Sequence, residues 1–178
     1  MSAKQIGVLI GGSGLIGGTI VNFYKTHHAN TVDIRAPSSK KVSLRDEEDV
    51  RGYLGEIRPD FVINAAMANL GASSRLALEV NYLGPVILAR AAAALGIPYI
   101  HISSAATLPA GENLREEDTL DLAPGLSNYA KSKLMAELTL RRMAEREGLD
   151  YSYIRLAIVY GPHDHKIQGF HRMFFSIS

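Results

Sequence analysis

IGVLIGGSGLIGG, residues 6–18, is an apolar run that ends in a cluster of glycines. Residues 6–10 carry no polar side chain, which is the pattern of a strand buried on both faces. Residues 17–28 have the composition of a helix that follows the glycines. A buried strand, a glycine turn and a helix in this order predict the first β–α unit of a parallel sheet covered by helices.

The rest of the chain repeats this alternation of apolar strands and helices. Helical patterns, each ended by glycine or proline, separate further strand-like segments. Right-handed crossovers between such strands give a doubly wound sheet. We find no internal repeat or linker, so the sequence predicts one α/β domain over 1–178, a Rossmann-type doubly wound parallel sheet with helices on both faces. The further predicted strands are 31–35, 61–66, 99–103 and 151–159, and the further helices are 47–58, 72–95 and 127–147.

Composition limits the kinds of partner. The 178 residues include 47% hydrophobic and 21% charged residues, as in ordinary globular proteins. Lys and Arg number 19 against 18 Asp and Glu, so bulk charge gives no reason to expect a nucleic acid or membrane surface as partner. The absence of cysteine excludes disulfides and thiol chemistry, and it fits a cytoplasmic location.

The glycines follow the spacing Gly11-x-x-Gly14-x-x-Gly17. A dinucleotide site needs a tight turn, close approach of the backbone to a pyrophosphate, and close packing of helix on strand. The helix N-terminus then offers unpaired N–H groups to the phosphates. The alternative is a flexible glycine-rich turn. The position between a buried strand and a helix favours an NAD(P) site, whose predicted contacts are Gly11, Ser13, Gly14, Leu15, Ile16 and Gly17.

The second predicted strand bears on the choice between NAD and NADP. Asp33 lies 19 residues after Gly14, close to the spacing of about 20 at which an acid meets the adenosine ribose. Arg35 points to the same side of a strand and, with Ser38 and Lys40, forms a phosphate-compatible group. These residues favour NADP over NAD. The alternative is that Lys40 and Lys41 belong to a solvated loop.

Tyr129 and Lys133 lie four residues apart in NYAKSK, residues 128–133. On a helix they share a face, about 6 Å apart along the axis. Taken alone, the pair is typical of an aromatic ring against an aliphatic stem. The functional reading is that the Lys133 ammonium favours ionisation of the Tyr129 phenol, because a free phenol, with a pKa near 10, is a poor base at neutral pH.

Taken together, the motifs resemble the extended short-chain dehydrogenase/reductases, which are NAD(P)-dependent epimerases, dehydratases and reductases that often act on nucleotide sugars. The glycine loop and the Tyr129–Lys133 pair match that family, and four more stretches follow its order. These are VINAAM (62–67), VNYLGP (80–85), ISSAATL (102–108) and RLAIVYGP (155–162). The resemblance covers nearly the whole chain and implies hydride transfer at a carbonyl or carbinol carbon.

The resemblance also implies roles for residues. Tyr129 is the expected acid/base, and Lys133 is expected to bind the nicotinamide ribose. Ser104 is expected to hold the substrate oxygen; Ser103 is the alternative, since a one-residue shift in alignment exchanges them. The remaining residues expected beside the cofactor are Asn64, Ala65, Ala66, Asn81 and Ser103.

Two departures from the family pattern stand out. Ser43-Leu44 replaces an Asp–apolar pair expected near the adenine. The chain also ends shortly after Pro162, so residues 162–178 are expected to be the start of a truncated substrate-binding lobe. A truncated product, a short natural member and a frameshifted remnant all remain open.

The helices, the histidines and the family resemblance give expectations about assembly, metal binding and substrate. By analogy with the family, the helices at 72–95 and 127–147 pair in a homodimer, although ordinary core packing explains their apolar residues equally well. His163-Asp164-His165 is expected to be a polar loop, and no metal site is expected. The substrate is expected to be a small molecule such as a nucleotide sugar. The alternative function is a non-catalytic NAD(P)-binding sensor or scaffold.

Overall fold

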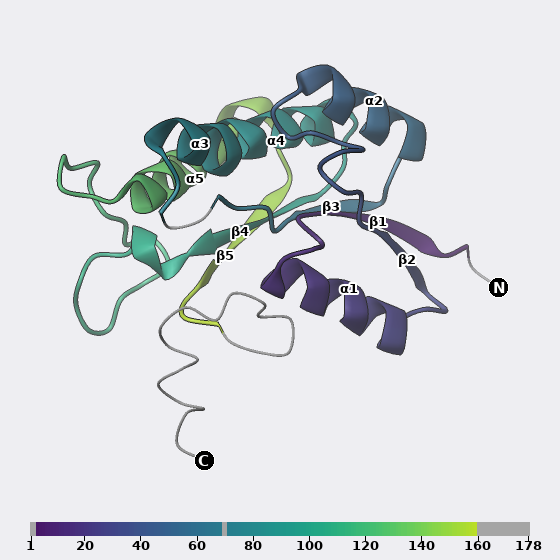
Figure 1. Ribbon diagram of the computed structural model, residues 1–178, viewed down its shortest axis with the longest axis horizontal. Coiled ribbons are helices and arrows are strands. Elements are labelled where there is room, and N and C mark those ends of the chain that lie inside the picture. Colours follow the sequence, from purple (N-terminus) through teal and green to yellow (C-terminus); the bar gives the residue numbers. More distant parts are fainter. Residues whose placement is uncertain (1–2, 69–70, 160–178) are drawn as a thin grey trace, which may run out of the picture.

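A computed structural model describes residues 3–68 and 71–159. Five parallel strands form one sheet in the order β2-β1-β3-β4-β5 (Figure 1). Their bounds are β1 Gln5–Ile10, β2 Val32–Arg35, β3 Phe61–Asn64, β4 Tyr99–Ser104 and β5 Tyr151–Leu156. Each predicted strand is therefore present, and β5 ends three residues earlier than predicted.

The direction of winding reverses between β1 and β3. The chain passes from β1 to β2 on one side and then returns to place β3 on the other side of β1, with Ile10 beside Asn64 at the carboxyl end. Open α/β sheets bind ligands in the crevice at such a switch point, beyond the carboxyl ends of the strands. The predicted Rossmann-type doubly wound sheet is confirmed.

Helices cover both faces of the sheet unequally (Figure 1). On one face lies α1 (Leu15–His27), over a small core of Leu9, Ile34 and Ile63. The other face carries the larger core, in which side chains of the sheet meet those of several helices. These helices are α2 (Glu47–Ile57), α4 (Gly84–Ala94) and α5 (Asn128–Glu147), and α3 (Ser74–Leu78) packs against α5 on the same face.

Local signals fix the helix ends. Asp46 caps α2 by accepting hydrogen bonds from the backbone N–H groups of Glu48 and Asp49, at 2.9 and 3.2 Å. Ser127 caps α5 through the N–H of Ala130 at 3.1 Å. Gly148, with φ of 71°, ends α5 in the left-handed conformation that glycine adopts without strain.

The predicted single helix at 72–95 is interrupted. A π-helical turn, η1 (Glu79–Leu83), separates α3 from α4. Pro85 explains the interruption, because it lacks the N–H that would bond to the carbonyl of Asn81 and its ring would clash with that carbonyl. A wider turn removes the clash, and such turns are frequent at functional sites.

The whole segment Ser74–Ala94 is long and apolar enough to qualify as a membrane span by composition. Half of its most apolar window is buried inside the protein, where α4 packs against α2 and α5. Burial of this kind is typical of a core helix in a layered α/β domain.

Candidate functional site

Of the three glycines in the spacing Gly11-x-x-Gly14-x-x-Gly17, two leave no room for a side chain. Gly11 has φ of 91°, and a Cβ there would lie 2.5 Å from the backbone nitrogen of Ala66. A Cβ on Gly17 would overlap the carbonyl oxygen of Gly11. These contacts hold α1, β1 and the loop after β3 together, so both glycines are required by packing.

Gly14 differs from its neighbours. It precedes α1 with an ordinary φ of −85°, and the nearest atom to a Cβ there is 3.6 Å away. No side chain in the described part of the chain caps α1, and its first turn carries no acidic residue. The N–H groups of this turn are therefore available to an anion, as a dinucleotide pyrophosphate requires.

Asn64 and Asn81 are fully buried, and their side chains bind the loop after β3. Asn64 accepts a hydrogen bond from Ala66 N–H at 3.1 Å. Asn81 accepts one from Ala68 N–H at 2.7 Å and donates to Ser132 on α5 at 3.2 Å. Both asparagines thus hold the backbone of the loop after β3, and Asn81 connects that loop to α5.

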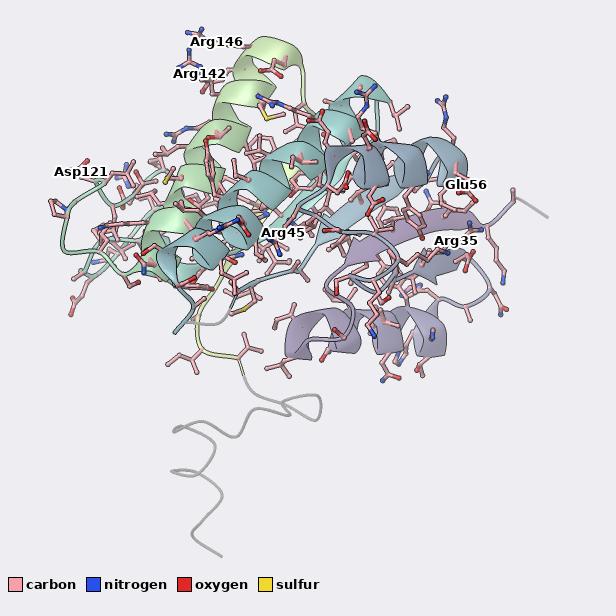
Figure 2. All side chains as sticks on the ribbon, turned by 45° about the horizontal axis from the view of Figure 1, so that its top comes forward. Arg35, Arg45, Glu56, Asp121, Arg142 and Arg146 are labelled. Carbon is pink, nitrogen blue, oxygen red and sulfur yellow. The ribbon has the colours of Figure 1, made fainter. Side chains whose placement is uncertain are left out.

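Asp33 and Arg35 lie on one side of β2, as the strand pattern predicts. Their side chains form an ion pair at 2.9 Å, with 49% and 39% of their side-chain surfaces exposed. Figure 2 shows Arg35 at the β2 edge of the sheet, far from Asp121 in the loop at 108–127. Ser38 is exposed, and its carbonyl accepts the turn hydrogen bonds of Lys41 and Val42.

Near the adenine position that the family pattern indicates, Ser43 binds its own loop. Its hydroxyl accepts from Arg45 N–H at 3.3 Å, and its N–H donates to Asp49 at 3.3 Å. Leu44 is buried against Gly84. The apolar half of the expected pair is therefore kept, whereas the acid is replaced by a hydroxyl.

Tyr129 and Lys133 have different surroundings on α5. Tyr129 is partly exposed in the first turn. Lys133 is 2% exposed, and its ammonium donates to the carbonyl oxygen of Ile102 on β4 at 2.8 Å. Burial lowers the pKa of Lys133 to about 8, an effect that the nearby Glu137 carboxylate opposes.

Ser103 and Ser104 point to opposite sides, as neighbours on a strand do. The Ser103 hydroxyl is buried and donates to Glu137. The partly exposed Ser104 hydroxyl accepts from Ala106 N–H at 3.2 Å, at the start of the short 3₁₀ turn η2 (Ala105–Thr107).

Sequence reasoning missed Glu137, which is 3% exposed on α5. Its carboxylate accepts from Ser103, from Thr107 at 3.0 Å, and from Arg155 on β5 at 2.7 Å. The available signal was its position four residues after Lys133, on a face that also carries Leu134 and Leu140. We call Ser103, Thr107, Lys133, Glu137 and Arg155 the polar cluster.

Arg155 extends this cluster to the loop at 108–127. Its Nη1 donates to the carbonyl oxygens of Glu116 and Asp118, both at 2.9 Å. Its pKa is raised, chiefly by hydrogen bonding to Glu137, so the guanidinium stays charged. The loop between Ser104 and Tyr129 is therefore held by a buried ion pair.

His101 was also missed. It is fully buried on the same side of β4 as Ser103, and its Nδ1 lies 3.3 Å from the hydroxyl of Tyr99. Asn64 donates to that hydroxyl at 3.1 Å. Within the described residues His101 Nε2 has no partner. Burial and the charge of Lys133 lower the pKa of His101 to about 3, so its ring is neutral at physiological pH.

Part of the predicted site lies outside the described residues. The Tyr160-Gly161-Pro162 turn, His163-Asp164-His165 and the rest of 162–178 belong there. Among residues 3–68 and 71–159, the glycine loop, the loop after β3 and Ser104 lie at the carboxyl ends of β1, β3 and β4, and Lys133 contacts β4 there through the Ile102 carbonyl. Tyr129 lies one helical turn before Lys133 on α5.

Comparisons with known proteins agree with this geometry. The family described as NAD dependent epimerase/dehydratase matches residues 8–177. ADP-L-glycero-D-manno-heptose-6-epimerase of Pseudomonas paraeruginosa is 31% identical over 118 residues, which are 66% of this chain. UDP-glucose 4-epimerase of Thermus thermophilus, solved with NAD, is 29% identical with a TM-score of 0.73 over 89% of this chain.

A dTDP-4-dehydrorhamnose reductase of Bacillus anthracis, solved with NADP, has a TM-score of 0.75 over 90% of this chain. At 20% identity its likeness shows the fold alone. The chain spans 35% of the heptose epimerase, 57% of the UDP-glucose epimerase and 56% of the reductase. The family match covers residues 8–177, and the fold and the glycine loop agree with it. The protein therefore belongs to the NAD dependent epimerase/dehydratase family.

Proposed function

We propose that this chain binds NAD(P) in the crevice beyond β1 and β3 and serves hydride transfer at a carbonyl or carbinol carbon of a nucleotide-activated sugar. The observation that carries the proposal is the openness of Gly14, in a loop where Gly11 and Gly17 admit no side chain. This opening lies at the N-terminus of α1. Tyr129 and Lys133 lie in the first turns of α5, and the Lys133 ammonium contacts the Ile102 carbonyl near the carboxyl end of β4.

The glycine loop fits the phosphates of the cofactor. The N–H groups of Leu15 and Ile16, in the uncapped first turn of α1, would bind the pyrophosphate with the positive end of the helix dipole behind them. The bound cofactor would supply or accept the hydride. The names of the relatives, which include a heptose epimerase and a UDP-glucose epimerase, support a nucleotide sugar as the other substrate.

The proton at the reacting oxygen is handled by residues of this chain. Tyr129, partly exposed in the first turn of α5, gives or takes the proton. Lys133 places a positive charge on the same helix face, one turn after Tyr129. Ser104 holds the substrate oxygen; the commitment of the Ser103 hydroxyl to Glu137 supports Ser104 over Ser103.

Tyr129→Phe tests the proposal. NADPH and NADH binding is measured by calorimetry, and conversion of UDP-, GDP-, ADP- and dTDP-linked sugars is followed by chromatography. We expect binding to stay within about twofold of the parent, while turnover falls by at least about a hundredfold, because general acid–base groups contribute roughly that much. Leu122→Ala, an exposed change in the neighbouring loop, is the control.

Two outcomes would count against this function. Turnover that survives in Tyr129→Phe would remove Tyr129 from the mechanism. Tight coenzyme binding by the parent with no turnover on any of these sugars would favour a sensor or scaffold instead.

A further inference from the structure

Two consecutive turns of α5 meet two consecutive residues of β4. Lys133 donates to the carbonyl oxygen of Ile102, and Glu137 accepts from the hydroxyl of the next residue, Ser103. Lys133 and Glu137 are four residues apart, so they lie on one helix face about 6 Å apart along the axis. Both are buried, so water does not screen their charges.

The Glu137 carboxylate is fixed from three other elements. Ser103 comes from β4, Thr107 from η2 and Arg155 from β5. Arg155 binds it through two nitrogens, with Nε at 3.1 to 3.2 Å and Nη2 at 2.7 Å. Such a bidentate contact holds the carboxylate in one orientation.

We infer that Glu137 is a positioning residue for Lys133: held by Arg155, Ser103 and Thr107, its carboxylate keeps the Lys133 ammonium charged and directed at the end of β4, beside the coenzyme crevice. This inference rests on the proposed function for its meaning in catalysis. Its physical content, a carboxylate that supports a buried ammonium, does not.

The charges around Lys133 leave Glu137 as its source of stabilisation. From β4, His101 faces the same layer and is neutral at physiological pH. From β5, the charged Arg155 would repel the ammonium if Glu137 did not lie in contact with it. From η1, the uncharged Asn81 contacts α5, whereas Glu79 is paired with Arg45 and Arg75. The arginines of the neighbouring α3 and α4, Arg75 and Arg90, are exposed, and Tyr129 belongs to the same helix as Lys133.

Glu137→Gln tests the inference, because glutamine keeps an acceptor for Ser103 and Thr107 but removes the charge. The protonation midpoint of Lys133 is measured by NMR on protein with ¹³C-labelled lysine side chains, and the signal is assigned by its loss in Lys133→Met. We expect the midpoint to fall by roughly one pH unit. The matched control is Glu145→Gln, an exposed carboxylate on the same helix, which should leave the midpoint unchanged.

If Glu137→Gln does not fold, a second variant carries the test. Glu137→Leu/Arg155→Leu replaces the buried pair with apolar groups, an exchange that proteins often tolerate. The Lys133 midpoint should fall in this variant too, although the guanidinium is gone. An unchanged midpoint in whichever variant folds would overturn the inference.

Coenzyme binding connects the result to function and separates the two proposals. The affinity of the parent for NADPH should weaken as the pH rises through about 8, where Lys133 loses its proton. In Glu137→Gln this weakening should begin at lower pH. If the parent binds neither coenzyme, the proposed function fails while the NMR result still decides the role of Glu137. If it binds with the same pH dependence in both proteins, the positioning role is refuted.

Discussion

The glycine loop and the polar cluster lie near the carboxyl ends of β1 and β4, and they are held together by different means. In the loop, backbone atoms approach so closely that Gly11 and Gly17 leave no space for a Cβ. In the polar cluster, the Glu137–Arg155 ion pair and its hydroxyl partners connect α5, β4 and β5. The packing of the glycine loop depends on residues without a Cβ, whereas the polar cluster depends on charges that compensate one another.

This difference predicts different responses to mutation. A methyl group added where backbone atoms are in close contact overlaps with those atoms, so its effect is steric and independent of pH. A buried charge that loses its partner, or that is itself removed, changes stability in a way that depends on protonation. Variants of the glycine loop and of the polar cluster should therefore differ in the pH dependence of their loss of stability, as well as in its magnitude.

The largest effect is expected from Gly17→Ala. Its Cβ would overlap the Gly11 carbonyl oxygen, so α1 must move away from β1. We expect a loss of about 3 kcal/mol or more in the free energy of unfolding, measured by urea denaturation, and no coenzyme binding.

Gly14→Ala is the matched control for this prediction. The nearest atom to its Cβ is 3.6 Å away, so stability should fall by less than about 1 kcal/mol. Coenzyme affinity should nevertheless fall by about tenfold or more, because the methyl group faces the place where the backbone must approach the pyrophosphate. Equal destabilisation by the two substitutions would contradict the steric account.

The same contrast explains how much the sequence could predict. The strand–glycine–helix order predicts the loop correctly because its determinants are local, and the alternation of apolar segments predicts the five strands. Strand β3 ends at Asn64 rather than at residue 66, because its partner β1 ends at Ile10 and the chain after Ala65 packs against Gly11. That contact joins distant segments and has no local signal.

The polar cluster was less predictable for the same reason. Glu137 and Arg155 are 18 residues apart, and nothing in the sequence pairs them. The i, i+4 spacing placed Tyr129 and Lys133 on one face correctly. It gave no indication that Lys133 is buried with its ammonium on the Ile102 carbonyl, because this contact depends on how α5 packs against β4.

A second prediction concerns the cost of burying Lys133. Its pKa is lowered from 10.5 to about 8, so the unfolded chain binds more protons than the folded protein between these values. Stability of the parent should therefore rise as the pH increases from about 8 to 10.5, and the full cost is present below pH 8.

Lys133→Met removes this cost. Chemical denaturation should show the variant to be more stable than the parent by about 1–3 kcal/mol at pH 7, allowing for the lost hydrogen bond to Ile102. The difference should shrink towards zero near the ordinary pKa of lysine. Lys131→Met, a neighbouring position whose side chain binds the Pro124 carbonyl, should show no such pH dependence. A variant less stable than the parent at every pH would show that the ammonium strengthens the fold.

The smallest effect is expected at the β2 edge of the sheet, where we expect the Arg35 side chain to select between the two coenzymes. Arg35 is paired with Asp33 at 2.9 Å, yet over a third of its side-chain surface is exposed. We expect a ribose 2′-phosphate to compete with Asp33 for the guanidinium, so that the parent prefers NADPH over NADH. Arg35→Ala should weaken NADPH binding about tenfold and leave NADH binding nearly unchanged, since a charge-assisted hydrogen bond contributes about 1.5–3 kcal/mol.

Arg51→Ala, which removes an exposed arginine on α2, is the control for the loss of one positive charge. Calorimetric titration with both coenzymes decides the matter: equal affinities in the parent, unchanged in Arg35→Ala, would mean that the Asp33–Arg35 pair is structural and that the selectivity for NADP is absent.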